Sequence, residues 1–253
     1  RIAKINLSLC FPELNDEQRE ELLKKNMQAC GLGLVETASC WFSDLQKLQT
    51  STEIIGKHHL DDALKKGKGV ILLSFHMTSL EIGACLLGAL LGTNYEIVGI
   101  YKPTKNALLN EATCKRRGRH SKGMLDRDNL RGIIKSLKSN KAIWYAIDQN
   151  NDGKSTVFAP FFGVQTATIT ATTKLAKMTG AAIIPFTQRR LDKPDSYQLT
   201  IHPAFENFPD VDEITDATRI NEFLESYLKK YPIDYLWLHQ RFRTRPPGEQ
   251  DIY

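Results

Sequence analysis

Several motifs that mark large enzyme classes are missing from this sequence. It contains no G-x-S-x-G nucleophile elbow, no P-loop, no G-x-G-x-x-G fingerprint after a strand and no H-E-x-x-H pair. Their absence argues against the common hydrolases, nucleoside triphosphatases and dinucleotide-dependent enzymes. No other cluster of His, Cys, Asp and Glu has the spacing of a metal site, so we expect neither a metal ion nor a cofactor.

Long hydrophobic segments and paired cysteines are also missing. The longest apolar run, 82–92, contains three glycines and has about half the length that a membrane-spanning helix needs. The five cysteines are an odd number without a C-x-x-C pair, which indicates reduced thiols in a protein that faces the cytosol. The chain starts at Arg1 without a signal peptide, so we expect any membrane anchor to lie in a segment that precedes it.

The overall composition is that of an ordinary globular protein. With 253 residues, of which 42% are hydrophobic and 25% charged, the chain can bury a substantial core, and disordered, collagen-like and coiled-coil classes are excluded. Repeats, low-complexity stretches and breaks in composition are absent, so we expect a single domain over residues 1–253. The net charge of +5 is partly local, because segment 115–122 holds five cations in eight residues.

Apolar runs of strand length predict the sheet. The run 70–75 is continuously apolar, as is typical of a central strand covered on both faces. Pro185 indicates that its strand lies at an edge of the sheet or donates no ladder bond at that residue. The strands are expected at 70–75, 96–101, 142–147, 181–187 and 197–202.

Helical spacing between these runs predicts the fold class. The first helix is long and amphipathic, is capped by Asn15 or Asp16, and is expected to kink near Gly31 and Gly33. Because strands alternate with helices of ten to fifteen residues, we expect an α/β fold with a mostly parallel sheet and helices on both faces. The helices are expected at 15–42, 60–66, 79–91, 106–114, 128–139 and 168–178.

Polar residues stand where three of the predicted strands end. His76 follows the first strand, Tyr101 and Lys102 end the second, and Asp148 follows the third. In open α/β sheets, ligands bind outside the carboxyl ends of the strands. The sequence therefore predicts a functional site at this edge of the sheet.

His76 and Glu81 form an H-x-x-x-x-E pattern across a strand, a turn and the start of a helix. A neutral imidazole is the usual general base near pH 7, and a carboxylate on its other nitrogen orients it and stabilises its charged form. One hypothesis is therefore a catalytic pair of His76 and Glu81. The alternative is structural: Thr78 would be the N-cap and Glu81 the third residue of a capping box, with Met77 packed against Ile82.

The basic segment 115–122 has two main interpretations. It is either a solvated loop or an anion site for phosphate or an acidic partner. Nucleic acid is disfavoured, because the pI of about 8.9 is low for that role and aromatic residues are not interleaved with the cations.

Asp148 begins a polar segment that superficially suggests a calcium loop. The twelfth position, where such a loop has Glu, is occupied by Ala159, so the match fails. Asp148 therefore remains a candidate for catalytic support, substrate binding or a helix cap.

Two aromatic segments have a structural and a functional interpretation. Segment 158–163 is either core or the wall of an apolar pocket. Segment 235–242 is either a buried last strand or a segment that presents Arg241 to a ligand.

Taken together, these residues resemble the late acyltransferases of lipid A biosynthesis, of the lauroyl or myristoyl type, within the glycerolipid acyltransferase superfamily. His76 and Glu81 match the H-x-x-x-x-D/E signature of that family, and Arg117 with Arg119 match its R-x-R. The other similar segments lie at 6–14, 101–103, 124–127, 144–148, 158–163 and 237–246.

This resemblance implies a reaction and its partners. The family transfers a fatty acyl group from acyl carrier protein to a hydroxyl on an acyl chain of a phosphorylated glucosamine disaccharide. It implies that His76 acts as the base and that Glu81 orients it. It also implies that the chain is the catalytic part of a protein anchored at the cytoplasmic face of the inner membrane.

The expected substrate-binding residues follow from the same resemblance. Arg117, Arg119 and Arg127 are expected to bind acceptor phosphates or the acidic carrier protein. Asp148 and Arg241 complete the expected set. Phe161, Phe162 and the helix over 82–91 are candidates for the acyl groove.

Two other functions stay open at this stage. The first is a related acyltransferase that uses acyl-coenzyme A or acylates another glycolipid or phospholipid. The second is a noncatalytic module that binds lipid or carrier protein, in which Glu81 is only a cap.

Overall fold

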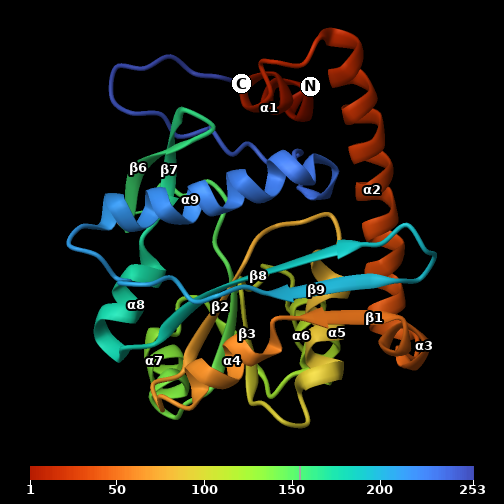
Figure 1. Cartoon of the computed structure of the whole chain (residues 1–253), viewed down its shortest axis with the longest axis vertical. Helices are drawn as coiled ribbons and strands as arrows, with labels where there is room; N and C mark the ends of the chain where they lie inside the picture. Colours follow the sequence, from red (N-terminus) through yellow and green to blue (C-terminus); the bar gives the residue numbers. More distant parts are fainter. Residues whose placement is uncertain (154) are drawn as a thin grey trace.

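The computed structural model describes residues 1–153 and 155–253. Within these residues the main sheet has seven strands in the order β1-β9-β8-β2-β5-β3-β4. Every neighbouring pair is parallel except β8 and β9, so the expected mostly parallel sheet is confirmed (Figure 1). Its strands are β1 (Thr52–Ile55), β2 (Val70–Ser74), β3 (Ile97–Tyr101), β4 (Met124–Asp126), β5 (Ala142–Ala146), β8 (Ala182–Arg190) and β9 (Tyr197–Ile201).

Helices cover both faces of this sheet, as expected for an α/β fold. Side chains alternate between the faces of a strand, so Ile71 and Leu73 pack with α1, α7, α8 and α9, whereas Val70 and Leu72 pack with α4 and α5. Figure 1 shows α9 on one side of the sheet and α4 and α5 on the other. The helices are α1 (Ile2–Cys10), α2 (Asp16–Phe42), α3 (Gln46–Thr50), α4 (Lys57–Leu64), α5 (Leu80–Leu91), α6 (Ala107–Arg117), α7 (Leu130–Lys138), α8 (Ala171–Thr179) and α9 (Glu213–Lys230), with 3-10 turns η1 (Gly118–His120) and η2 (Pro232–Asp234).

Strand β2 is the middle strand, and all of its residues are buried. The prediction that this apolar run forms a central strand is confirmed. Pro185 does not mark an edge, because β8 lies between β2 and β9. The parallel pairing of β8 with β2 ends at Pro185, and its antiparallel pairing with β9 begins at Phe186, so the missing N–H falls where the strand changes partner.

Helix α2 begins as the sequence predicts and then departs from the prediction. The side chain of Asn15 accepts a hydrogen bond from the Gln18 amide, and Gln18 returns one to Asn15, which forms a capping box. The helix then continues through Gly31 and Gly33 without interruption. Gly33 serves a close approach: a Cβ there would lie 2.2 Å from the carbonyl oxygen of Thr78.

The second sheet is a hairpin that the sequence analysis did not predict. Strands β6 (Thr156–Phe161) and β7 (Val164–Ile169) pair antiparallel, and φ is positive at both linking residues, Phe162 and Gly163. The helix predicted over 168–178 therefore begins later, at Ala171, because Thr168 and Ile169 belong to β7.

Tyr235, Trp237, Arg241 and Phe242 of the segment Tyr235–Phe242 are buried and Leu238 is exposed, but the segment is not the expected last strand. It forms one isolated bridge, between Tyr235 and Met77. Asparagine side chains satisfy its backbone carbonyls instead: Asn6 donates to the carbonyls of Trp237 and His239 at 2.8 Å each. Asn26 donates to the carbonyl of Tyr235 at 2.7 Å. Apolar spacing cannot reveal such a segment, because its side chains are buried without a ladder of backbone bonds.

None of the helices in residues 1–153 and 155–253 combines the length and the apolar character needed to span a membrane.

Gly31 and Gly33 provide a matched test of this packing. We expect Gly33→Ala to lower the free energy of unfolding by about 1–3 kcal/mol, because the new methyl group overlaps backbone. Gly31 has no atom within 4 Å of the corresponding position, so Gly31→Ala should stabilise the chain by up to about 1 kcal/mol through helix propensity. Urea unfolding of both variants measures the difference. Equal effects would contradict the close approach of α2 to Thr78.

Candidate active site

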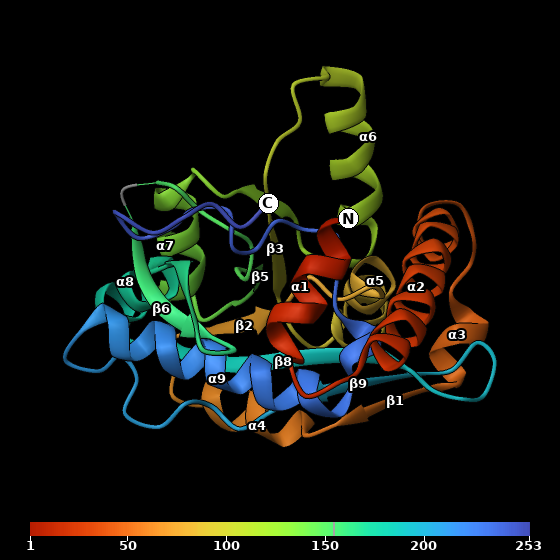
Figure 2. The ribbon, with the colours of Figure 1, turned by 90° about the horizontal axis from the view of Figure 1, so that it is seen from above.

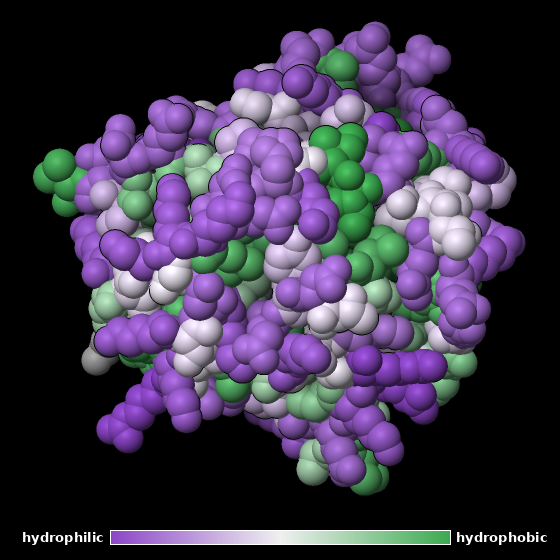
Figure 3. All heavy atoms as spheres, turned by 60° about the horizontal axis from the view of Figure 1, so that its bottom comes forward, coloured by the Kyte–Doolittle hydropathy of each residue, from purple (hydrophilic) through white to green (hydrophobic). Residues whose placement is uncertain are grey.

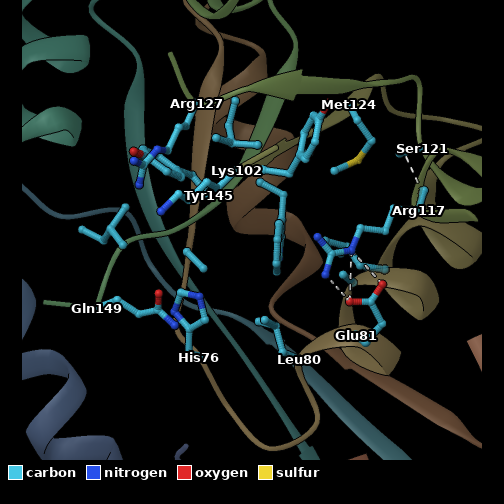
Figure 4. Close-up of a pocket in the computed structure, with 18 of the residues that line it drawn as sticks. His76, Leu80, Glu81, Lys102, Arg117, Ser121, Met124, Arg127, Tyr145 and Gln149 are labelled. Atoms are coloured by element: carbon cyan, nitrogen blue, oxygen red, sulfur yellow. Dashed lines mark hydrogen bonds and ion pairs between the residues drawn. The ribbon is translucent and has the colours of Figure 1, made fainter. Parts of the chain in front are cut away.

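A pocket of about 360 Å³ lies at the carboxyl ends of β2, β3 and β5, the edge where the sequence predicts a site. Helix α5 forms one wall, and residues of β3, β4 and β5 form the other. Figure 4 shows polar side chains at both ends of this pocket, with His76 at one end and Glu81 at the other. Its apolar wall includes Leu80, Ala84, Leu87, Ile97, Ile100 and Trp144.

His76 and Asp148 are brought together by the parallel pairing of β2 with β5. The register pairs Ser74 with Ala146, and each of the two polar residues follows two positions later. The Nδ1 atom of His76 lies 2.8 Å from Oδ1 of Asp148. The backbone N–H of His76 also donates to both carboxylate oxygens, at 2.9 and 3.1 Å.

The Asp148 carboxyl is buried, yet it is held in its ionised form. Burial acts to raise the pKa of Asp148, but attraction to His76 and the hydrogen bonds from His76 outweigh burial and lower the pKa. An ionised carboxylate can only accept hydrogen bonds, so Nδ1 of His76 carries the proton in this pair. In the neutral form of His76, which lines the pocket, the other ring nitrogen, Nε2, carries no proton and can accept one.

Glu81 does not contact His76, so the expected pairing of these two residues is wrong. The carboxylate of Glu81 instead accepts hydrogen bonds from Nε and Nη2 of Arg117, at 2.9 and 2.8 Å. The indole Nε1 of Trp41 donates to it at 3.0 Å. The physical reason is the position of Glu81 in the first turn of α5, where it faces α6 and α2 across the pocket from His76 (Figure 4).

The capping alternative for Glu81 is also wrong. The N-cap of α5 is Ser79, whose side chain makes no capping hydrogen bond. Thr78, the expected cap, uses its hydroxyl to accept from Arg190 at 2.9 Å.

Arg117 is a charged part of the pocket wall. Burial acts to lower the pKa of Arg117, but the hydrogen bonds and the negative charge of Glu81 raise it overall. The bidentate contact fixes the guanidinium group beside the apolar wall. Glu81 therefore supports the site through Arg117.

The other predicted binding residues lie in three different environments. Arg127 lines the pocket together with Lys102 and Tyr145 (Figure 4). Arg119 is exposed in η1 and lies outside the pocket wall. Arg241 is buried and donates to the carbonyl of Ala167 at 2.7 Å, so its assignment to substrate binding is wrong. Its role is to hold the β6–β7 hairpin.

Only one of the two candidate segments for the acyl groove lines the pocket. Residues of α5, including Leu80 and Leu87, line the pocket. Phe161 is buried in the hydrophobic core instead, and Phe162 packs against that core.

An ion pair outside the pocket holds the turn between His76 and Glu81. Arg190 contacts both carboxylate oxygens of Glu36 in α2, at 2.6 and 2.7 Å. The same guanidinium donates to the hydroxyl and the carbonyl of Thr78, at 2.9 and 3.0 Å. The turn that carries His76 is therefore tied to α2 and to the end of β8.

Gln149 and Asn150, which follow Asp148, also line the pocket, although their residue types alone predict no role for them. The backbone N–H of Asn150 donates to Nε2 of His239 at 2.9 Å. Burial lowers the pKa of His239 to about 4, which keeps this ring neutral and able to accept the bond. Their position in the sequence is the available signal, because Gln149 and Asn150 come shortly after the end of β5.

In the described part of the chain, no three His, Cys, Asp or Glu side chains are grouped so that they could hold a metal ion.

The chain resembles known proteins along nearly its whole length. Residues 1–244 match the family described as "Bacterial lipid A biosynthesis acyltransferase". The "Lipid A biosynthesis lauroyltransferase" of Escherichia coli (strain K12) is 38% identical over 100% of this chain and 82% of its own length. The "Lipid A biosynthesis palmitoleoyltransferase" of the same strain is 36% identical over 100% of this chain and 81% of its own length.

Among solved structures, the 1-acyl-sn-glycerophosphate acyltransferase PlsC of Thermotoga maritima covers 90% of this chain and 94% of its own, at 14% identity and a TM-score of 0.42.

The neutral His239 predicts how stability depends on pH. Its pKa of about 4 in the folded chain lies below the value of about 6.5 in an unfolded chain. Between these values the unfolded chain binds the additional proton, so the free energy of unfolding should decrease as the pH falls from 6.5 to 4. Urea unfolding at pH 7 and pH 5 measures this decrease. It should be smaller in His239→Gln, which keeps an acceptor without the titrating ring, and an unchanged decrease would contradict the assignment.

Proposed function

Because this chain belongs to the bacterial lipid A biosynthesis acyltransferase family, we propose that it transfers a fatty acyl group, lauroyl or one of similar length, from acyl carrier protein to a hydroxyl on an acyl chain of a lipid A precursor. The observation that carries this proposal is the buried pair of His76 and Asp148 beside an apolar pocket with cationic side chains. A base, an apolar cavity and cations are what such a transfer requires.

His76 acts as the general base in this proposal. Its Nε2 atom takes the proton from the acceptor hydroxyl while the hydroxyl oxygen attacks the carbonyl carbon of the thioester. The carbon–sulfur bond then breaks, and the sulfur leaves with the proton that His76 returns. Asp148 stabilises the imidazolium form between these two proton transfers. The products are the ester and the free thiol of the carrier protein.

The cationic residues bind the anionic parts of the two substrates. Arg127 and Arg117 lie in the pocket wall and are suited to acceptor phosphates. Arg119 lies outside the wall and is exposed, which suits contact with the acidic carrier protein. Glu81 contributes by keeping Arg117 in one orientation.

The acyl chain occupies the apolar part of the pocket. Leu80 and Leu87 of α5 form one side of it, and Ile97 and Gly99 of β3 form part of the other. This places the thioester near His76 at the polar end.

The acceptor chemistry also suggests a location. A lipid A precursor carries several acyl chains and resides in a membrane, so the chain is proposed to work at the cytoplasmic face of the inner membrane.

Product masses test the reaction directly. The chain is incubated with lauroyl acyl carrier protein and an under-acylated lipid A precursor, and we expect a mass gain of one or two lauroyl groups. His76→Ala should lose the product by about 10²-fold or more, because the acceptor hydroxyl loses its base. A full rate of transfer by His76→Ala at saturating substrate would refute the role of His76.

Lauroyl-coenzyme A is tested in parallel as the donor. Equal transfer from both donors, or transfer only to another lipid in an acceptor panel, would replace the carrier protein or the acceptor in the proposal. No transfer with any donor and acceptor would favour a binding module.

A second pair of variants separates the roles of the two carboxylates. Asp148→Asn should lower kcat by about 10²-fold to 10⁴-fold with little change in KM, because the imidazolium loses its charged partner. Glu81→Gln should mainly raise the KM of the acceptor, because Arg117 loses its anchor. Initial rates over a range of acceptor concentrations give both constants. The reverse pattern would return the orienting role to Glu81.

A further inference from the structure

The second half of α2 presents a surface without charge. Residues 16–25 include seven charged side chains among ten residues, but in 27–42 the only charged residue is Glu36. Glu36 is buried and paired with Arg190, so it contributes nothing to the outer surface. All residues from 27 to 42 are described by the structure.

Apolar side chains form one continuous line on this outer surface. Met27, Leu34, Val35 and Phe42 are separated by 7, 1 and 7 residues, which places them within about 100° of one another around the helix. They are exposed by 44%, 76%, 62% and 69%. Gly31 and Ala38 fill the gaps and are also exposed. We call Met27, Leu34, Val35 and Phe42 the α2 stripe.

The α2 stripe faces away from the body of the protein. Asn26, Glu36 and Cys40, on the opposite side of the same helix, are buried. Figures 1 and 2 show α2 at one side of the molecule, with the body on one side of it only. The stripe is therefore an apolar line about 22 Å long whose four side chains are all exposed in the described chain.

On the face shown in Figure 3, hydrophilic residues predominate around smaller hydrophobic groups. Single exposed apolar residues are ordinary, whereas a contiguous exposed patch marks a surface that contacts a partner or a membrane.

Cations stand at one end of the α2 stripe. The guanidinium of Arg116 lies 4.7 Å from the centre of the Phe42 ring and donates to the carbonyl of Trp41 at 2.8 Å. Lys115 and Arg119 are exposed next to it, within the basic segment 115–122. An apolar helix face with adjacent cations is suited to the surface of an anionic lipid bilayer.

The same end of the stripe adjoins the pocket. Trp41 donates to Glu81, and Glu81 holds Arg117 in the pocket wall. Trp41, the residue before Phe42, thus contacts the pocket wall directly, so a bilayer in contact with Phe42 would lie close to the pocket.

We propose that the α2 stripe docks on the surface of an anionic bilayer, with the cations of segment 115–122 against the lipid headgroups. The expectation that the docked membrane supplies the acceptor rests on the proposed function, but the docking itself does not. The charges favour lipid over a second copy of this chain, because a symmetric contact would bring the same cationic surface to both sides.

Sedimentation with vesicles tests the docking. The chain should sediment with vesicles of phosphatidylcholine and phosphatidylglycerol, and less with phosphatidylcholine alone or at high salt. Leu34→Asp combined with Val35→Asp should lower the partition coefficient of the chain between water and vesicles by about tenfold or more, because two apolar contacts are replaced by charges.

Val211→Asp is the matched control. Val211 is 92% exposed just before α9, away from α2, so this variant should bind vesicles as the unchanged chain does. We expect these variants to fold, because every substituted residue is exposed. Thermal unfolding of each variant verifies this. Equal binding by the α2 variant and the control would overturn the proposal.

Light scattering without vesicles distinguishes a second copy from lipid. A dimer that the α2 variant converts to a monomer would mean that another chain covers the stripe, and the proposal would be wrong. Lys115→Gln should weaken binding to the anionic vesicles only. His76→Ala should sediment like the unchanged chain, so loss of acyl transfer and loss of docking are recorded separately.

Discussion

The site depends on the parallel pairing of β2 with β5. This pairing sets two strand ends side by side, and the backbone N–H and the ring of His76 both bind the carboxylate that follows β5. A buried carboxylate is costly unless its oxygens accept hydrogen bonds, and here one residue supplies several of them. The geometry of the His76–Asp148 pair is thus set by the register of two paired strands, each of which ends two residues before one member of the pair.

The opposite end of the pocket is built by helices. There Glu81 joins α5 to Arg117 at the end of α6 and to Trp41 at the end of α2. The ion pair of Arg190 with Glu36 holds the intervening turn through Thr78. The two residues of the H-x-x-x-x-E pattern therefore lie at opposite ends of one pocket, and the turn that connects β2 to α5 lies between them.

Much of the fold could be predicted from the sequence, because the parallel strands are buried on both faces and read as apolar runs. The location of the site followed from the same strands and a general property of parallel sheets. The partner of His76 could not be assigned, because the choice between Glu81 and Asp148 depends on strand order. The roles of Arg241 and of segment 235–242 were missed for a related reason. An arginine in an aromatic segment has the same sequence pattern whether its hydrogen bonds go to a hairpin or to a ligand.

The asparagine contacts to segment 235–242 have a consequence for how the protein is made. Asn6 in the first helix binds the carbonyl of Trp237, a separation of 231 residues, and Tyr253 near the end of the chain also contacts Asn6. During synthesis Asn6 emerges from the ribosome long before Trp237 and must remain without this partner until residue 237 has been made. Helix α1 and the segment 235–242 beside His76 thus reach their final packing together, late in synthesis.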